Sequence, residues 1–237
     1  MIRRLAPLAC AAALSVGAAL AIAPAAQADA TPVSLGSAAS FGVLGSSTVT
    51  STGNTRVNGD LGLYPGTSVT GFPPGVVNGD THIADSVALQ AQNDAQAAYN
   101  AAAAEPDGTS LTGQDLGGMT LPPGVYNFAS SAGLTGTLVL DGQGDPDSVF
   151  IIQVGSTLTT ASSSDVRLIN GAKARNVIWQ IGSSATLGTY STFNGNILAY
   201  ASITETTGVK VHGLAAALTA AVTLDDNKVT APAPALR

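Results

Sequence analysis

Apolar and polar stretches alternate along nearly all of residues 33–230. Three stretches are apolar at almost every position, namely 149–152, 177–179 and 197–200. A strand that is apolar at every position is covered on both of its faces. After each of these stretches comes a shorter one, in which an aliphatic residue stands between small residues that point the other way. The pattern predicts a mainly β fold.

Self-similar segments recur along the chain. Ile152–Ser156 is matched 27 residues later by Trp179–Ser183, and Ile203-Thr204 is matched 19 residues later by Val222-Thr223. Spacings of this size suit the coils of a β-solenoid, each built from three short strands. The sequence therefore predicts a solenoid of roughly six to seven three-sided coils.

One segment interrupts the strands. From about residue 82 to residue 104 the chain lacks Gly and Pro and is rich in Ala and Gln, which predicts one long α-helix. Asp80 or Thr81 is expected to cap its start, and Glu105–Gly108 to end it. A mostly small-residue stripe should let the helix pack closely along the apolar side of the solenoid: Ile83, Val87, Ala91, Ala95, Ala98 and Ala102.

The second side of the coils has an unusual composition. Seven triplets can be aligned so that a central Val, Leu or Ile points inward between two outward residues: Thr48-Val49-Thr50, Ser68-Val69-Thr70, Gly133-Leu134-Thr135, Thr157-Leu158-Thr159, Thr186-Leu187-Gly188, Ser202-Ile203-Thr204 and Ala221-Val222-Thr223. None of the fourteen outward positions is charged, although this face is expected to meet water. The third side is more polar and carries Arg56, Arg167, Lys210, His212 and Lys228.

The first 28 residues are predicted to lie outside this domain. Arg3 and Arg4 precede an apolar run that ends in a small-residue cleavage motif, Ala26-Gln27-Ala28, as in a secretory signal peptide. The mature protein is thus expected to be secreted and extracellular. We expect the solenoid domain to span 29–230, followed by a short Pro/Ala tail, 231–237.

The composition of the chain argues against several classes of function. Charged residues make up 10% of the chain, and removing Arg3 and Arg4 leaves seven basic residues against fifteen acidic ones. No basic patch large enough for nucleic acid is expected. Beyond residue 28 no apolar run approaches the length of a membrane span. We expect a monomer.

Catalysis and metal binding find little support in the pattern. Solenoid enzymes that act on polysaccharides need converging carboxylates, whereas the acids here fall mostly at turns. Asp141, Asp145 and Asp147 form a small acidic cluster that suits calcium, but turn chemistry is the stronger interpretation. His82 and His212 lack partners at metal-ligand spacing. We expect no catalytic residue, no cofactor and no bound metal.

The second side instead suggests adsorption to a crystal. Strands about 4.8 Å apart, with outward residues about 6.7 Å apart along each strand, would form a flat lattice of methyl and hydroxyl groups. Threonine is stiff at χ1 and its hydroxyl can anchor one water, so such a lattice can hold water in fixed positions. Binding to ice is one hypothesis. A secreted structural or adhesive solenoid is the other, because Thr and Ser are common on strands in any case.

Several segments resemble one family. Residues 142–160, together with 35–44, 58–62 and 221–225, look like signatures of the secreted microbial ice-binding proteins. The resemblance implies a right-handed, discontinuous β-solenoid with one helix alongside, in which the chain before the helix and the chain after it stack out of sequence order. It also implies a flat strand face that binds ice and inhibits ice growth or recrystallisation.

The resemblance and the triplets together predict the residues that meet ice. They are Thr48, Thr50, Ser68, Thr70, Thr135, Thr157, Thr159, Thr186, Ser202, Thr204 and Thr223, with Gly133, Gly188 and Ala221 interrupting the array. The alternative is an adhesive or envelope-associated solenoid module without ice activity.

Overall fold

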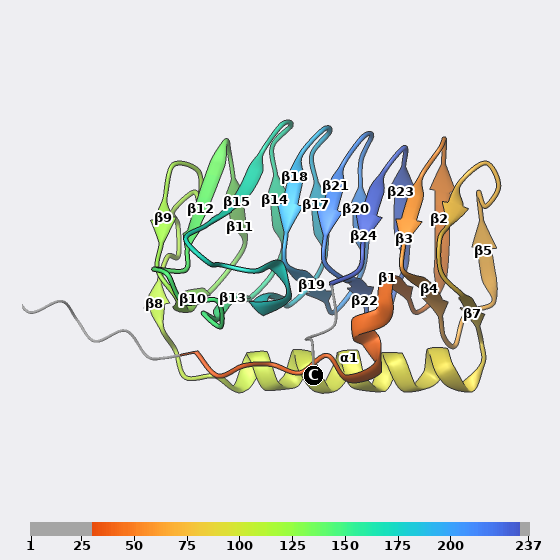
Figure 1. Ribbon diagram of the computed structural model, residues 1–237, viewed down its shortest axis with the longest axis horizontal. Helices are drawn as coiled ribbons and strands as arrows, with labels where there is room; N and C mark the ends of the chain where they lie inside the picture. Colours follow the sequence, from red (N-terminus) through yellow and green to blue (C-terminus); the bar gives the residue numbers. More distant parts are fainter. Residues whose placement is uncertain (1–29, 233–237) are drawn as a thin grey trace, which may run out of the picture.

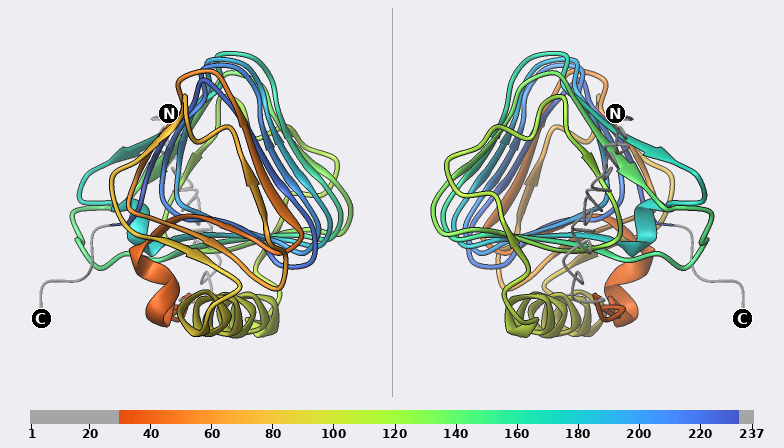
Figure 2. Two further views of the ribbon diagram at one scale, coloured as in Figure 1. Left: turned by 90° about the vertical axis from the view of Figure 1, so that its right-hand side faces the viewer. Right: turned by 90° about the vertical axis from the view of Figure 1, so that its left-hand side faces the viewer.

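A computed structural model describes residues 30–232 as a three-sided prism of parallel sheets, with one long helix along one side (Figures 1 and 2). Sheet A has nine strands, in the order β7 (Thr81–Ile83), β4 (Asp60–Leu63), β1 (Phe41–Gly45), β22 (Ala215–Ala217), β19 (Asn196–Ala199), β16 (Val177–Ile181), β13 (Phe150–Val154), β10 (Gly124–Phe128) and β8 (Thr109–Ser110).

Sheet B has seven strands, in the order β11 (Ala132–Leu134), β14 (Leu158–Thr160), β17 (Ala185–Leu187), β20 (Ile203–Glu205), β23 (Val222–Asp225), β2 (Thr48–Thr52) and β5 (Ser68–Thr70). Sheet C has eight, in the order β6 (Val76–Val77), β3 (Arg56–Asn58), β24 (Lys228–Thr230), β21 (Lys210–His212), β18 (Thr192–Asn194), β15 (Asp165–Ile169), β12 (Thr137–Asp141) and β9 (Thr120–Leu121). The predicted β-solenoid is confirmed.

The coils stack out of sequence order. β1, β2 and β3 pair in parallel with β22, β23 and β24, so the chain before the helix lies directly against the C-terminal coil. The chain after the helix begins at the far end of the prism and returns toward this seam, as the colours of Figure 1 show. The discontinuity predicted for the fold is therefore present.

Helix α1 (Ser86–Ala104) carries the chain from one end of the prism to the other. Its 19 residues rise about 28 Å, while the strand spacings of sheet A add up to about 38 Å, and the short links on either side supply the rest. Asp85 caps the helix, its carboxylate accepting a hydrogen bond from the Ala88 amide at 2.8 Å. The start predicted at residue 82 is wrong, because Thr81–Ile83 pairs with β4 as strand β7.

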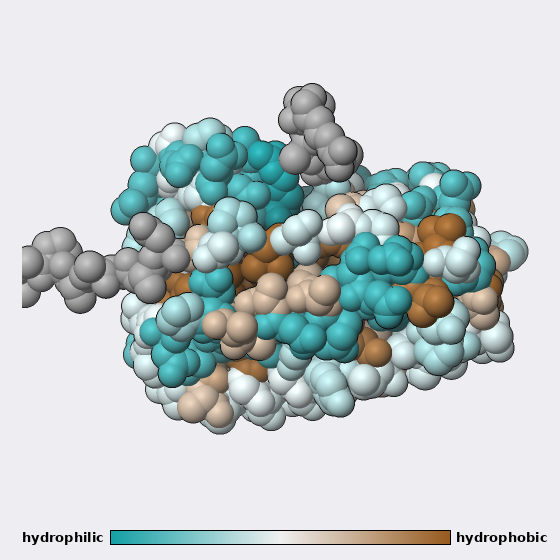
Figure 3. All heavy atoms as spheres, turned by 90° about the horizontal axis from the view of Figure 1, so that it is seen from below, coloured by the Kyte–Doolittle hydropathy of each residue, from teal (hydrophilic) through white to brown (hydrophobic). Residues whose placement is uncertain are grey.

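The packing of α1 on sheet A depends on small residues. Ala91, Ala95, Ala98 and Ala102 are fully or almost fully buried, as the stripe predicts. Two large residues were expected to pack in the same stripe, and this prediction is wrong, because Ile83 and Val87 remain 40% and 44% exposed. Seen from the helix side, apolar and polar residues are interspersed over this face (Figure 3).

Two buried glutamines lock the helix in place. The Gln92 amide donates to the Gly45 carbonyl at 2.7 Å and to the Ala217 carbonyl at 3.4 Å, and thereby bridges β1 and β22 across the seam. Gln153 donates to the Ala102 and Glu105 carbonyls at the end of the helix. These carbonyls would otherwise lack intrahelical partners. The helix is thus tied to both halves of the discontinuous solenoid.

The interior of the prism is filled by inward residues of all three sheets. Trp179 is fully buried there and packs against Phe193 with ring centroids 4.8 Å apart. One ionisable group interrupts this core. Glu205 lies in register between Leu187 and Leu224, it is 1% exposed, and neither of its carboxylate oxygens has a hydrogen-bond partner. Burial raises the pKa of Glu205 to about 8.

This carboxyl should make stability fall as pH rises. Below the pKa of the unfolded chain Glu205 is protonated in both states, and between that pKa and about pH 8 the unfolded chain ionises while the folded protein keeps the proton, so stability falls over this range and reaches its lower level above about pH 8. Glu205→Leu should therefore raise the free energy of unfolding at pH 9 by on the order of 4 kcal/mol, measured by urea denaturation. Glu205→Gln should only abolish the dependence of stability on pH that Glu205 causes. A parental protein equally stable at pH 5 and pH 9 would contradict this.

Candidate functional site

The outer face of sheet B carries a continuous row of threonines. Register pairs join Thr159 to Thr186, Thr186 to Thr204, Thr204 to Thr223, Thr223 to Thr50 and Thr50 to Thr70. Gly133 pairs with Thr159 and ends the row at β11. Neighbouring members are about 4.8 Å apart because they occupy adjacent strands. Six threonines on six consecutive strands thus form one straight line.

A second row runs parallel to the first, two residues earlier along the chain and about 6.7 Å away, at the first residue of β2 and β5 and immediately before the other strands. Its members are small and uncharged, and adjacent hydroxyls are linked: Ser131 to Thr157 at 2.8 Å and Ser184 to Ser202 at 3.0 Å. Thr48 pairs with Ser68 at the other end. The row consists of Ser131, Thr157, Ser184, Ser202, Ala221, Thr48 and Ser68.

The far edge of the face, at the corner with sheet C, carries the carboxylate of Asp225. Asp225 pairs with Thr52, and its oxygens accept hydrogen bonds from the hydroxyls of Thr207 and Thr52. These two bonds, with that of Thr207 the stronger, hold the pKa of Asp225 below its usual value. Hydrogen bonds therefore compensate the charge of Asp225 at the edge of the face, and the residues of the two rows are uncharged.

The backbone stacks closely at the corner between sheets A and B. Gly182 lies over Gly155, where a Cβ on Gly182 would come within 2.5 Å of the Gly155 carbonyl oxygen. Beneath the rows the inward residues are mostly aliphatic and buried. The result is a flat surface without a protruding long side chain in either row.

Two of the seven predicted triplets are out of register. The inward residues aligned with Leu158 and Ile203 are Ala132 and Ala185, whereas Leu134 and Leu187 lie one inward position further on. The pattern favoured the larger leucines over the alanines as the inward residues of these two coils. Because the resulting displacement is two residues, the same side chains still point outward. Thr135 and Thr186 therefore still point outward, Thr186 in the central row and Thr135 at the edge.

Correcting the register adds Ser131 and Ser184, which the sequence interpretation missed. Continuing the alternation from the flanking coils would have found both. All the residues predicted to form the site lie on the outer face of sheet B or directly beside one of its strands: Thr48, Thr50, Ser68, Thr70, Thr135, Thr157, Thr159, Thr186, Ser202, Thr204 and Thr223.

The other two sides differ chemically from sheet B. Apolar outward residues of sheet A, such as Ile151, Ile178 and Leu198, are buried in the cluster that includes the alanines of α1. Sheet C exposes Arg56, Lys210 and Lys228. Sheet B is thus the side that the helix leaves open and whose two central rows carry no charge.

The acidic cluster of Asp141, Asp145 and Asp147 stabilises turns. Asp141 accepts hydrogen bonds from the Gln143 amide and from Asn170, and Asp145 accepts one from the Asp147 amide. Within residues 30–232 no three His, Cys, Asp or Glu side chains are grouped so that they could hold a metal. The same part of the chain contains no helix that is long and apolar enough to cross a membrane.

Fold and face together define a class: three-sided β-solenoids with one flanking helix and a flat, hydroxyl-bearing strand surface. The chain belongs to the ice-binding-like family, whose model matches residues 43–230. It is 57% identical over 197 residues to an ice-binding protein of Nostoc sp. (strain HG1), a match that covers 83% of this chain and 73% of the relative.

Solved structures agree with this membership. The crystal structure of an ice-binding protein from the Antarctic ascomycete Antarctomyces psychrotrophicus matches with a TM-score of 0.82 at 48% identity, over 85% of this chain and 99% of that one. An ice-binding protein with antifreeze activity from an Arctic yeast matches with a TM-score of 0.80 at 28% identity, over 87% and 97%. The family resemblance and the fold class are confirmed, and these relatives are named as ice-binding proteins rather than as enzymes.

Asp115 fastens the end of sheet B. Its carboxylate accepts hydrogen bonds from the Gly117 amide at 2.7 Å, from the Thr135 amide at 2.9 Å and from the Thr135 hydroxyl at 3.0 Å. Burial pushes the pKa of Asp115 up, but these bonds outweigh it and the pKa lies below its usual value.

Stability should therefore fall as pH drops through the lowered pKa of Asp115, and it should be fully present above the pKa of the unfolded chain. Asp115→Ala should reduce the free energy of unfolding at pH 7 by about 1 kcal/mol, since the group is exposed and solvent screens it. Denaturant titration measures the loss. Asp115→Asn, which keeps one acceptor oxygen, should lose less; equal stability of the alanine variant would show that the contacts are neutral.

Proposed function

We propose that this protein adsorbs to ice through the outer face of sheet B and thereby inhibits ice growth or recrystallisation. The observation that carries the proposal is the unbroken central row from Thr159 to Thr70 on six neighbouring strands. The chain's membership in a family whose named relatives are ice-binding proteins supports the same function.

The face suits ordered water for a simple reason. Each threonine presents a hydroxyl that can donate and accept hydrogen bonds, and a methyl group that excludes disordered water. The stiff χ1 of a β-branched residue fixes both groups relative to the strand. Because parallel strands repeat these positions at a constant spacing, waters held by one threonine recur along the row in a regular array.

Adsorption then acts without any reaction. A rigid protein held at the ice front forces the ice between bound molecules to grow with a curved surface, and curvature lowers the local freezing temperature. Inhibition requires only that the array stay flat and rigid. Buried aliphatic residues beneath the face and the continuous ladder of strands both provide this rigidity.

An adhesive or envelope-associated module without ice activity receives less support. It would leave the uncharged, aligned rows without a role, and the named relatives are ice-binding proteins. We further infer a secreted monomer. The signal peptide predicted over residues 1–28 lies outside the described residues, and secretion rests on the sequence pattern.

The first test is thermal hysteresis, with the shape of the ice crystals, on purified residues 29–237 over a concentration series. A freezing gap that grows with concentration, together with faceted crystals, is expected. Absence of both gap and shaping at high concentration would remove the proposed function and leave only the fold.

Tyrosine variants then locate the face. Thr204→Tyr or Thr159→Tyr places a bulky ring in the central row, so either change should abolish most of the hysteresis while circular dichroism stays unchanged. Thr192→Tyr is the matched control, since Thr192 stands at an equivalent outward position on strand β18 of sheet C. Thr204→Ser should change little. Full activity in the folded Thr204→Tyr and Thr159→Tyr proteins would show that sheet B is the wrong face.

A further inference from the structure

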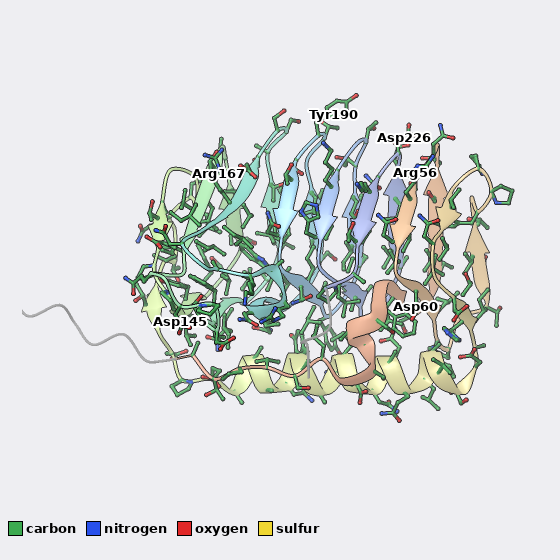
Figure 4. All side chains as sticks on the ribbon, viewed as in Figure 1. Arg56, Asp60, Asp145, Arg167, Tyr190 and Asp226 are labelled. Carbon is green, nitrogen blue, oxygen red and sulfur yellow. The ribbon has the colours of Figure 1, made fainter. Side chains whose placement is uncertain are left out.

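Positive charge is confined to one side of the prism. The described part of the chain contains six Lys and Arg residues, and each of them lies on sheet C or in the loop that follows β15: Arg56, Arg167, Lys173, Arg175, Lys210 and Lys228. Figure 4 marks Arg167 and Arg56 near opposite ends of this side. In a protein with a net charge of −6, such segregation produces a local field of the opposite sign.

Three of these cations form a ladder. Lys210 pairs in register with Lys228, and Lys228 pairs with Arg56, so their side chains point outward from adjacent strands about 4.8 Å apart. None of the three forms an ion pair with another described residue. Like charges directly opposite each other destabilise a sheet. A stacked repeat of cations therefore costs stability.

A hollow of about 380 Å³ adjoins the ladder. Lys173 and Arg175 line it from the loop after β15, and His212 lines it from β21. Leu168, Ala172 and Pro232 give it an apolar wall. Partial burial, followed by the charges of Lys228 and Lys210, lowers the pKa of His212, so this imidazole senses the ladder beside it.

We propose that the outer face of sheet C and its hollow bind an acidic polysaccharide whose sugars carry carboxylates. A row of cations at constant spacing suits a linear polymer with regularly repeated negative charges. Arg56 can bind a carboxylate through two parallel hydrogen bonds, while Thr192 and Thr230 offer hydroxyl partners to the sugar. The hollow is large enough for one sugar ring against its apolar wall.

Nucleic acid fits this face less well. Single strands are held by several aromatic side chains on which bases stack, and the outward residues of β3, β24, β21, β18 and β15 include no Phe, Tyr or Trp and only one imidazole, that of His212. Duplex DNA requires many phosphate contacts, whereas the ladder supplies three cations. The surrounding hydroxyl and amide groups favour a sugar polymer.

The position of this face has a functional consequence. Sheets B and C form different sides of the prism (Figure 2), so a polymer on sheet C leaves the threonine rows uncovered. A protein held in an acidic polysaccharide matrix could therefore meet ice at the same time. The binding site itself does not depend on the function proposed for sheet B.

Gel electrophoresis through a matrix containing polygalacturonate tests the proposal, with dextran as the neutral control. Residues 29–237 should be retarded by polygalacturonate at low salt and not by dextran. The triple variant Arg56→Glu/Lys210→Glu/Lys228→Glu should bind at least about tenfold more weakly, because the attraction is mainly electrostatic. Neutral Gln at the same three positions should give an intermediate loss.

Two readouts separate this face from sheet B. The triple variant should retain its fold by circular dichroism and the full thermal hysteresis of the parent, whereas Thr204→Tyr should keep its retardation. Polygalacturonate should also raise the pKa of His212, followed by NMR, because the polymer neutralises the neighbouring lysines. Undiminished binding by the triple variant would overturn the assigned face, and tighter binding to duplex DNA at the same salt would overturn the assigned partner.

Discussion

In-register stacking of parallel strands is the constraint on which the rest of this structure depends. Each residue lies directly over its equivalent in the next coil, so a property shared by equivalent residues becomes a row along the prism. Inward positions are mostly apolar, because three sheets enclose them. Outward positions are free of that demand, and whatever residue type they share is displayed at a constant spacing. The threonine row on sheet B and the cation ladder on sheet C are both products of this rule.

The break in sequence order follows from the same constraint. A solenoid whose coils stack only in chain order grows from one end, whereas here the chain crosses to the far end through α1 and fills the gap backward. The final coil must then match β1, β2 and β3 in register on all three sides. Gln92 bonds to carbonyls on both sides of this seam. The helix therefore acts as a connector and as a clamp for a joint that chain continuity does not secure.

Sequence periodicity predicts the faces better than it predicts the register. The alternation of aliphatic and small residues placed every proposed threonine and serine outward, because a displacement of two residues does not change the face. It misaligned the coils of Ala132 and Ala185, since a buried alanine resembles an outward small residue while the following leucine resembles the core. The start of the helix was misplaced for a related reason: Thr81–Ile83 lacks Gly and Pro, but tertiary pairing with β4 makes it a strand. The charge ladder needed the register itself, which only the stacked structure supplies.

Flatness alone does not distinguish sheet B from sheet C, since both are open faces of one prism. Their difference lies in hydration. An ammonium or guanidinium group orients its own water shell and moves on a flexible stem, whereas a threonine hydroxyl is held within one side-chain length of the backbone. Waters on sheet C therefore follow mobile charges, and waters on sheet B follow the strand lattice. In the functions proposed here, ice binds to sheet B and a polyanion binds to sheet C, so one repetitive fold would present two incompatible kinds of surface without interference.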